Sequence, residues 1–238
     1  MLKKLIFFAL LCVSLQGFEF KSLHFKIEDI KGKFIYIQDD ERIKIGTSAA
    51  VLQSFKNTSS IISSATVIQR EDGLIKLELS PFTILEQKAL PLLDSKVQKG
   101  DEVIVNFLYD RILLIAPNEE NYNSIREKFN QLYFVHPDLL GAYMIREFKL
   151  SPKQKDFKLF CASNAVGVLA FVLEDKISFL DCASFTVLFE EPFNSLNLEA
   201  QKPFYSNVEG YKKNFFNFFE WGVKDYYEYY KKLIGEGR

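Results

Sequence analysis

The sequence has little of the material from which most catalytic and metal sites are built. Its 238 residues include three cysteines, two histidines and eleven glycines. It contains no CxxC pair, no cluster of histidines and carboxylates at metal-ligand spacing, and no glycine-rich phosphate loop. We therefore expect no catalytic, cofactor-binding or metal-ligating residues, and we interpret the protein as a non-enzyme.

The residues nearest to a catalytic pattern have simpler interpretations. Ser48 follows Gly46-Thr47 but lacks the second glycine of a nucleophile elbow, so it is predicted to be a turn residue. His24 lies on the polar side of a predicted strand, and His136 precedes Pro137 at a helix break. Both fit surface or capping roles. A hydrolase that uses dispersed carboxylates is the enzyme alternative that these residues leave open.

An excess of charge of one sign is also missing. The chain has 30 lysines and arginines against 31 aspartates and glutamates, a formal net charge of -1, and the two signs are interspersed. Nucleic acids and acidic lipid surfaces attract proteins through an extended basic field. Nucleic acid is therefore excluded as a partner.

No apolar run in the sequence is long enough to span a bilayer. Lys3 and Lys4 precede an apolar stretch from Leu5 to Val13, and Gly17 is a small residue suited to cleavage. This pattern is typical of a secretory signal peptide over residues 1–17, and the apolar stretch is too short to span a bilayer. We expect an exported protein of the periplasm or cell surface, with a mature N-terminus near Phe18 and no transmembrane span in the mature chain.

Removal of the signal peptide would leave two cysteines, Cys161 and Cys182. Exported proteins fold where thiols oxidise, so an even number of cysteines first suggests a disulfide. Two unpaired buried thiols that pack as small apolar groups are the alternative. In either case we expect the two residues to lie close together.

Residues 18–117 alternate apolar and polar side chains with the period of a strand. Residues 23–27 and 34–37 read as one hairpin, and residues 61–69 and 74–79 read as another around Asp72-Gly73, a pair suited to a tight primed turn. Residues 112–116 form a continuous apolar run, as expected of a strand that is buried on both faces. We predict an antiparallel, β-barrel-like domain over residues 18–117.

Residues 118–192 read as a small α+β domain. Asn118 can cap a first helix, a second helix runs from Pro137 to Glu147, and Ser151-Pro152 can start a third. Residues 166–173 and 177–189 are then expected to form a hairpin. The predicted fold class is thus α+β, and residues 193–210 form a linker.

Residues 211–234 are predicted to form a C-terminal amphipathic helix that is rich in aromatic residues. The helix either packs on the protein's own sheets, which we favour, or offers a surface to a partner. The first alternative places a defined set of side chains against the sheets: Phe215, Phe218, Tyr226 and Leu233. The second makes the following residues candidates for partner binding: Trp221, Lys224, Glu228, Lys231 and Lys232.

Several stretches together resemble one known family. They are Ile45-Gly-Thr-Ser-Ala-Ala-Val51, Gly100-Asp-Glu-Val-Ile-Val-Asn-Phe-Leu-Tyr109, Leu113-Leu-Ile-Ala-Pro-Asn118, His136-Pro-Asp138 and Phe179-Leu-Asp-Cys-Ala-Ser-Phe185. With the export signal, they are similar to the N-terminal domain of the plasminogen-binding cell-surface proteins of epsilon-class Gram-negative bacteria. The resemblance implies an exported, non-enzymatic protein that captures host plasminogen.

The resemblance also implies how such a partner would be held. Kringle domains of plasminogen bind a lysine side chain together with a nearby carboxylate, and a C-terminal lysine supplies both. The sequence here ends at Gly237-Arg238, so internal lysines beside acids, such as Lys224 or Lys231 with Glu228, would have to supply the ligand. The alternative function is a periplasmic structural or assembly factor that engages another envelope protein through the aromatic helix.

Overall fold

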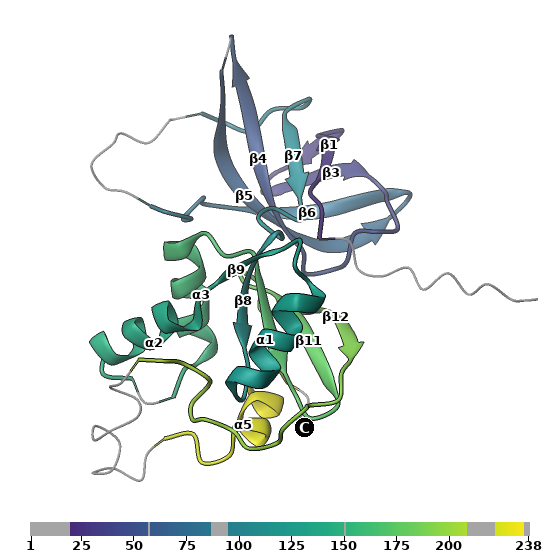
Figure 1. Ribbon diagram of the computed structural model, residues 1–238. Coiled ribbons are helices and arrows are strands. Elements are labelled where there is room, and N and C mark those ends of the chain that lie inside the picture. The colour runs from purple at the N-terminus through teal and green to yellow at the C-terminus, as the bar shows by residue number, and fades with distance from the viewer. Residues whose placement is uncertain (1–19, 57, 87–94, 150, 209–221, 236–238) are drawn as a thin grey trace, which may run out of the picture.

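A computed structural model describes residues 20–56, 58–86, 95–149, 151–208 and 222–235. The strands of these residues form two sheets, one above the other in Figure 1. Sheet A has seven strands in the order β1-β7-β4-β5-β6-β3-β2, and sheet B has five in the order β12-β11-β10-β8-β9. Four described helices pack beside sheet B. The predicted α+β class is confirmed.

Sheet A is antiparallel and curls into a half-barrel. Its strands are β1 (Leu23–Lys26), β2 (Asp29–Lys31), β3 (Phe34–Gln38), β4 (Ser48–Phe55), β5 (Thr58–Glu71), β6 (Leu74–Ser80) and β7 (Glu102–Val105). Alternate side chains of these strands point inward and form one apolar core, which includes Ile35, Val51, Val67, Leu77 and Val103. The period of two in the sequence thus produces a half-barrel with one dry face.

The short link between β1 and β2 joins the two edges of sheet A. β1 pairs with β7 at one edge and β2 pairs with β3 at the other, yet only Ile27 and Glu28 separate β1 from β2. The Ile27 amide donates to Asp101 on the β7 side, and the Glu28 amide donates to Tyr36 in β3. The expected hairpin into residues 34–37 does form, but its first strand is β2 (Asp29–Lys31). The assignment of residues 23–27 to that hairpin is wrong, because the chain changes partner at Ile27 and β1 pairs with β7.

The second expected hairpin is confirmed. β5 and β6 pair antiparallel around Asp72 and Gly73, whose φ angles of 50° and 75° are both positive. A primed turn requires such angles, and the Asp-Gly pair adopts them at low cost.

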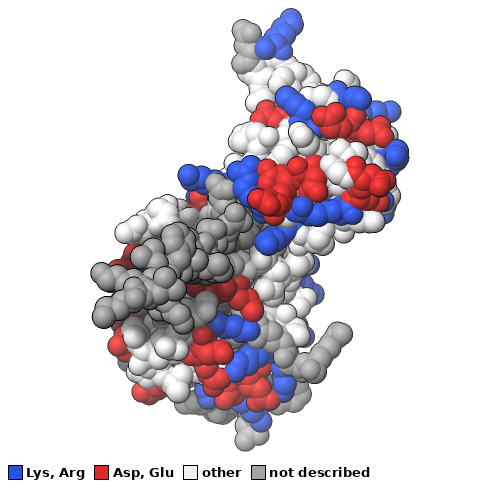
Figure 2. Space-filling model, turned by 90° about the vertical axis from the view of Figure 1, so that its right-hand side faces the viewer, with Lys and Arg blue, Asp and Glu red and all other residues white. Residues whose placement is uncertain are grey.

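Over the face of sheet A seen in Figure 2, basic and acidic side chains are interleaved, as their mixture in the sequence predicts.

Sheet B lies between two helical layers. Its strands are β8 (Arg111–Ile115), β9 (Tyr133–Val135), β10 (Val168–Val172), β11 (Lys176–Asp181) and β12 (Val187–Pro192). Helix α1 (Glu119–Lys128) covers one face, and helices α2 (Pro137–Arg146), α3 (Gln154–Asn164) and α5 (Tyr226–Leu233) cover the other. β8 is parallel to both β9 and β10. Each of these connections carries helices, as parallel strands require.

Several local predictions hold. β8 is buried on both faces, and Asn118 caps α1 by accepting a hydrogen bond from the Asn121 amide. His136 caps α2 through its side chain, and Pro137 is the first residue of that helix. β8 lies before residue 117 in the sequence, but it hydrogen-bonds within sheet B.

Three boundaries differ from those predicted. α3 begins at Gln154, because Lys153 rather than Ser151 is the N-cap, and the Asp156 carboxylate accepts a hydrogen bond from the Lys153 amide at 2.9 Å. The expected strand over residues 177–189 is two strands, since a turn from Asp181 to Thr186 separates β11 from β12. Asp225 caps α5, so the described part of the C-terminal segment becomes helical only at Tyr226.

Candidate functional site

The junction of the two sheets is organised around one buried carboxylate. Asp181 is the last residue of β11 and is fully buried. Its Oδ2 atom accepts hydrogen bonds from the Ser48 amide at 2.8 Å and from the Tyr109 hydroxyl at 2.7 Å, and its Oδ1 atom accepts one from the Ser184 amide at 2.7 Å. Ser48 begins β4 of sheet A, so this side chain joins the two sheets.

Burial controls the chemistry of this junction. It raises the pKa of Tyr109 well above 10.0, and the negative charge of Asp181 raises it further. The phenol therefore remains a hydrogen-bond donor at neutral pH. Gly46 lies so close to Thr186 that an added Cβ would sit 2.6 Å from that side chain. The sheets are thus in tight contact at this point.

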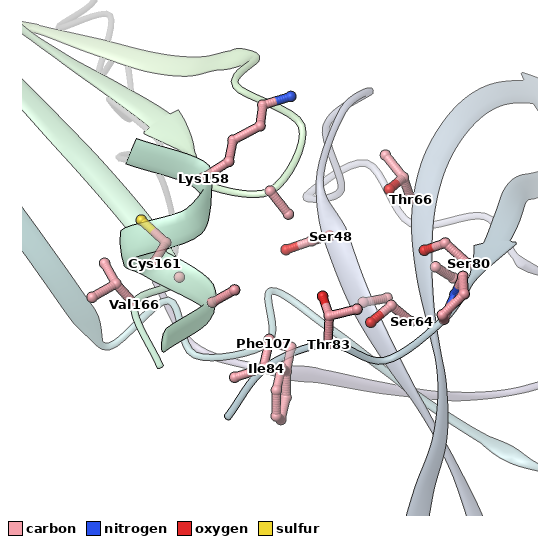
Figure 3. Close-up of a pocket in the computed structure, with 16 residues that line it drawn as sticks. Ser48, Ser64, Thr66, Ser80, Thr83, Ile84, Phe107, Lys158, Cys161 and Val166 are labelled. Atoms are coloured by element: carbon pink, nitrogen blue, oxygen red, sulfur yellow. The ribbon is translucent and has the colours of Figure 1, made fainter. Parts of the chain in front are cut away.

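A cleft with a volume of about 190 Å³ opens beside the junction. Figure 3 shows α3 on one side of it and strands of sheet A on the other. The strand side is rich in hydroxyl groups, and the loop after β6 adds another: Ser48, Ser64, Thr66, Ser80 and Thr83. Ser48 lies directly opposite Thr66 in the sheet, and Ser64 lies opposite Ser80, so these pairs share a face.

The helical side of the cleft supplies one positive charge. Lys158 is the single ionisable side chain among the described lining residues, and its ammonium donates to the Ser184 carbonyl at 3.1 Å. Apolar groups complete the wall, notably Phe107, Ile84 and Val166. The lining residues include no carboxylate or imidazole that could act as a general base. This arrangement can bind a small molecule but offers no evident acid–base chemistry.

Cys161 also lines the cleft, and it forms a disulfide with Cys182. The Cα atoms of the pair are 6.3 Å apart, within the range that a disulfide spans. The bond ties α3 to the loop that follows Asp181. Both the helical wall and the loop that holds Lys158 are therefore fixed to sheet B.

The candidate partner-binding residues lie on or near α5. Lys224, Glu228 and Lys232 are exposed, and Glu228 pairs with Lys232 across one helical turn. Lys231 pairs with Glu174. Lys224 with Glu228 is not among the ion pairs of the described residues, and Trp221 lies outside them.

The described aromatic residues of α5 face inward. Tyr226, Tyr227 and Tyr230 are buried, and the hydroxyls of Tyr226 and Tyr230 donate to the carbonyls of Ile115 and Pro203. Leu233 packs against the same core. The core interpretation is confirmed for Tyr226 and Leu233, whereas Phe215 and Phe218 lie outside the described residues.

The two histidines occupy separate places. His24 Nδ1 lies 2.6 Å from Glu102, and His136 accepts from the Asp138 amide at the start of α2. Within the described ranges, no three histidine, cysteine, aspartate or glutamate side chains gather as a metal site would require. The same ranges contain no helix that is long and apolar enough to cross a membrane.

Sequence patterns did not identify Asp181, Tyr109 and Lys158 as a group. A weak signal exists in Asp181-Cys-Ala-Ser184, where an aspartate that ends an apolar strand precedes a serine by three residues. Such spacing is typical of a side-chain-capped turn. Nothing in the linear sequence brings Tyr109 or Lys158 to that turn, because both come from other elements.

Comparison with known proteins identifies the family of this chain. The chain is 27% identical over 195 residues to Plasminogen-binding protein PgbA from each of two Helicobacter pylori strains. The matched region is 81% of this chain and 43% or 42% of those proteins, so the chain spans less than half their length. Residues 22–234 also match the family described as plasminogen-binding protein pgbA N-terminal. This match includes both sheets, so the chain belongs to the PgbA N-terminal family.

Proposed function

We propose that this chain is an exported, non-enzymatic binding protein of the periplasm or cell surface, and that plasminogen is its protein partner. The family match over residues 22–234 carries the proposal, since both named relatives are plasminogen-binding proteins. The signal-peptide pattern of residues 1–17 supports export. The binding role is consistent with a cleft whose lining residues lack a general base.

The exposed side of α5 and the segment just before it offer the chemistry that a kringle recognises. Lys232 pairs with Glu228, and Lys224 is exposed and precedes Asp225, the N-cap of the helix. Exposed ion pairs are weak, so a partner can replace the Glu228–Lys232 pair at little cost. Lys231 is half-buried against Glu174 and is less accessible. We therefore assign Lys224 and Lys232 as the first lysines to test.

Surface plasmon resonance on the processed chain tests plasminogen binding. We expect saturable binding that 6-aminohexanoate, a lysine analogue, abolishes by competition. The double variant Lys224→Ala/Lys232→Ala should weaken binding about tenfold, the loss expected for a charge-assisted contact. The matched control Lys33→Ala/Lys99→Ala changes two lysines of sheet A or its loops and should bind like the parent. Binding that persists in the presence of 6-aminohexanoate would contradict recognition through lysine side chains. Absence of binding would contradict plasminogen as the partner.

Export is tested separately. The mature N-terminus should fall near Phe18, as mass spectrometry of the envelope fraction can establish. Protease added to intact cells distinguishes the two compartments, because only a surface-exposed chain will be cleaved. An intact Met1 on protein recovered from the cytosol would contradict the proposed export.

A further inference from the structure

We propose that the cleft between sheet A and α3 binds a single sugar ring that carries a carboxylate. This site is separate from the α5 surface and does not depend on plasminogen binding. Clefts between structural units are common ligand sites, and a volume of about 190 Å³ is below the range for drug-sized molecules. At about 30 Å³ per water molecule, the volume equals roughly six waters. The cleft therefore suits a small polar molecule.

The hydroxyl groups of the cleft point to a polyhydroxylated ligand. Ser48, Ser64, Thr66, Ser80 and Thr83 line it, and none of their hydroxyls has a hydrogen-bond partner in the described part of the chain. Each hydroxyl can donate one hydrogen bond and accept two. A sugar ring presents the same mixture of donors and acceptors around an apolar body. The ring hydroxyls can thus pair with the strand side, while the apolar body contacts Phe107 and Val166.

Lys158 points to a negative charge on the ligand. Its ammonium uses one of three N–H donors on the Ser184 carbonyl, and no acidic side chain lines the cleft among the described residues. A carboxylate is the complementary partner, and a charge-assisted hydrogen bond is stronger than a neutral one. A sugar acid is the ligand class that satisfies both the hydroxyls and the ammonium.

The junction holds this site in place. Asp181 binds the amides of Ser48 and Ser184, so the same carboxylate positions a strand hydroxyl and the carbonyl that receives Lys158. The disulfide fixes α3, which carries Lys158, to the adjacent loop. Rigid support of this kind lowers the entropy lost when a small ligand binds.

Titration calorimetry on the processed chain tests the proposal with D-glucuronate as the probe. Glucose, which lacks the carboxylate, and acetate, which lacks the ring, serve as comparison ligands. We expect glucuronate to bind at least about tenfold more tightly than either comparison ligand. No binding of glucuronate, or equal binding of glucose or acetate, would overturn the proposal.

Variants locate the binding to this cleft. Lys158→Met should reduce glucuronate affinity about tenfold, whereas Lys155→Met, on an exposed position of the same helix, should not. Ser64→Ala removes a hydroxyl that has no partner in the described residues, so it should weaken binding while the unfolding midpoint stays unchanged. Equal losses in Lys155→Met and Lys158→Met, or full affinity in Ser64→Ala, would refute the assigned site.

Discussion

At the residue scale, the structure depends on polar groups that satisfy one another in the interior. Asp181 receives three hydrogen bonds at full burial, one of them from the other sheet. A buried donor that loses its acceptor costs about 1–3 kcal/mol. The free energy of unfolding is therefore unusually sensitive to this one side chain.

Replacement of Asp181 by alanine tests this sensitivity. Asp181→Ala would leave the Ser48 amide, the Ser184 amide and the Tyr109 hydroxyl without their acceptor, and we expect a loss of about 3 kcal/mol or more. Urea unfolding monitored by circular dichroism measures the change. Asp110→Ala, at an exposed position, is the control and should stay within about 0.5 kcal/mol of the parent. Similar losses in both variants would contradict the role of Asp181.

Alkaline pH tests the buried phenol of Tyr109. In the unfolded chain this group ionises near its ordinary pKa of about 10, whereas burial first, and then Asp181, raises the pKa in the folded state. Above pH 10 the folded state therefore holds more protons than the unfolded state, so stability falls as pH rises. Below pH 10 this contribution is fully present.

The comparison variant is Tyr109→Phe, which cannot ionise. We expect it to be less stable than the parent at pH 8, because Asp181 loses a donor, and the gap in urea midpoint to narrow between pH 10 and pH 11. Other groups titrate in this range in both proteins, so the difference between the two isolates Tyr109. A gap that stays constant would contradict the raised pKa.

At the element scale, two kinds of contact hold the helices against sheet B. The apolar side of each helix can be recognised in the sequence, whereas the polar contacts cannot. α1 buries Tyr122 and Ile125, one helical turn apart, against the sheet. α5 adds tyrosine hydroxyls that reach backbone carbonyls of other elements. Its aromatic content thus serves both packing and hydrogen bonding.

Truncation of Tyr226 measures what α5 contributes. The side chain is fully buried and its hydroxyl donates to the Ile115 carbonyl at 2.7 Å, so Tyr226→Ala should destabilise the protein by about 3–5 kcal/mol. Thermal and urea unfolding provide the measurement. Lys232→Ala on the exposed side of the same helix should have little effect. An unchanged unfolding midpoint in Tyr226→Ala would show that α5 is not part of the core.

At the scale of the whole molecule, the connection between the sheets determines how the chain unfolds. Polar contacts at Asp181 and close packing of Gly46 on Thr186 join them, and the Leu85 amide also donates to the Ala162 carbonyl of α3. We propose that residues 18–117 and residues 118–192 form two domains of the chain. β8, which precedes residue 117, is a central strand of sheet B.

Calorimetry tests whether the two sheets form one cooperative unit. We expect a single unfolding transition for the parent, since unfolding of either sheet would expose the buried contacts of Asp181. Asp181→Ala should broaden this transition or divide it into two. Two resolved transitions in the parent would show that the sheets are energetically independent.

Local chemistry was sufficient to predict much of the fold and little of the site. Strand alternation, the Asp72-Gly73 turn and the caps at Asn118 and His136 depend on neighbours in the sequence, so the sequence by itself determined them. Strand partners depend on distant segments, which is why β1 was assigned to the wrong neighbour and β9 was missed. The cleft likewise depends on segments that are distant in the sequence. Only the tertiary structure brings Lys158 of α3 and Ser64 of sheet A to one cleft, and Asp181 of sheet B to the Ser48 amide, because these residues come from different elements.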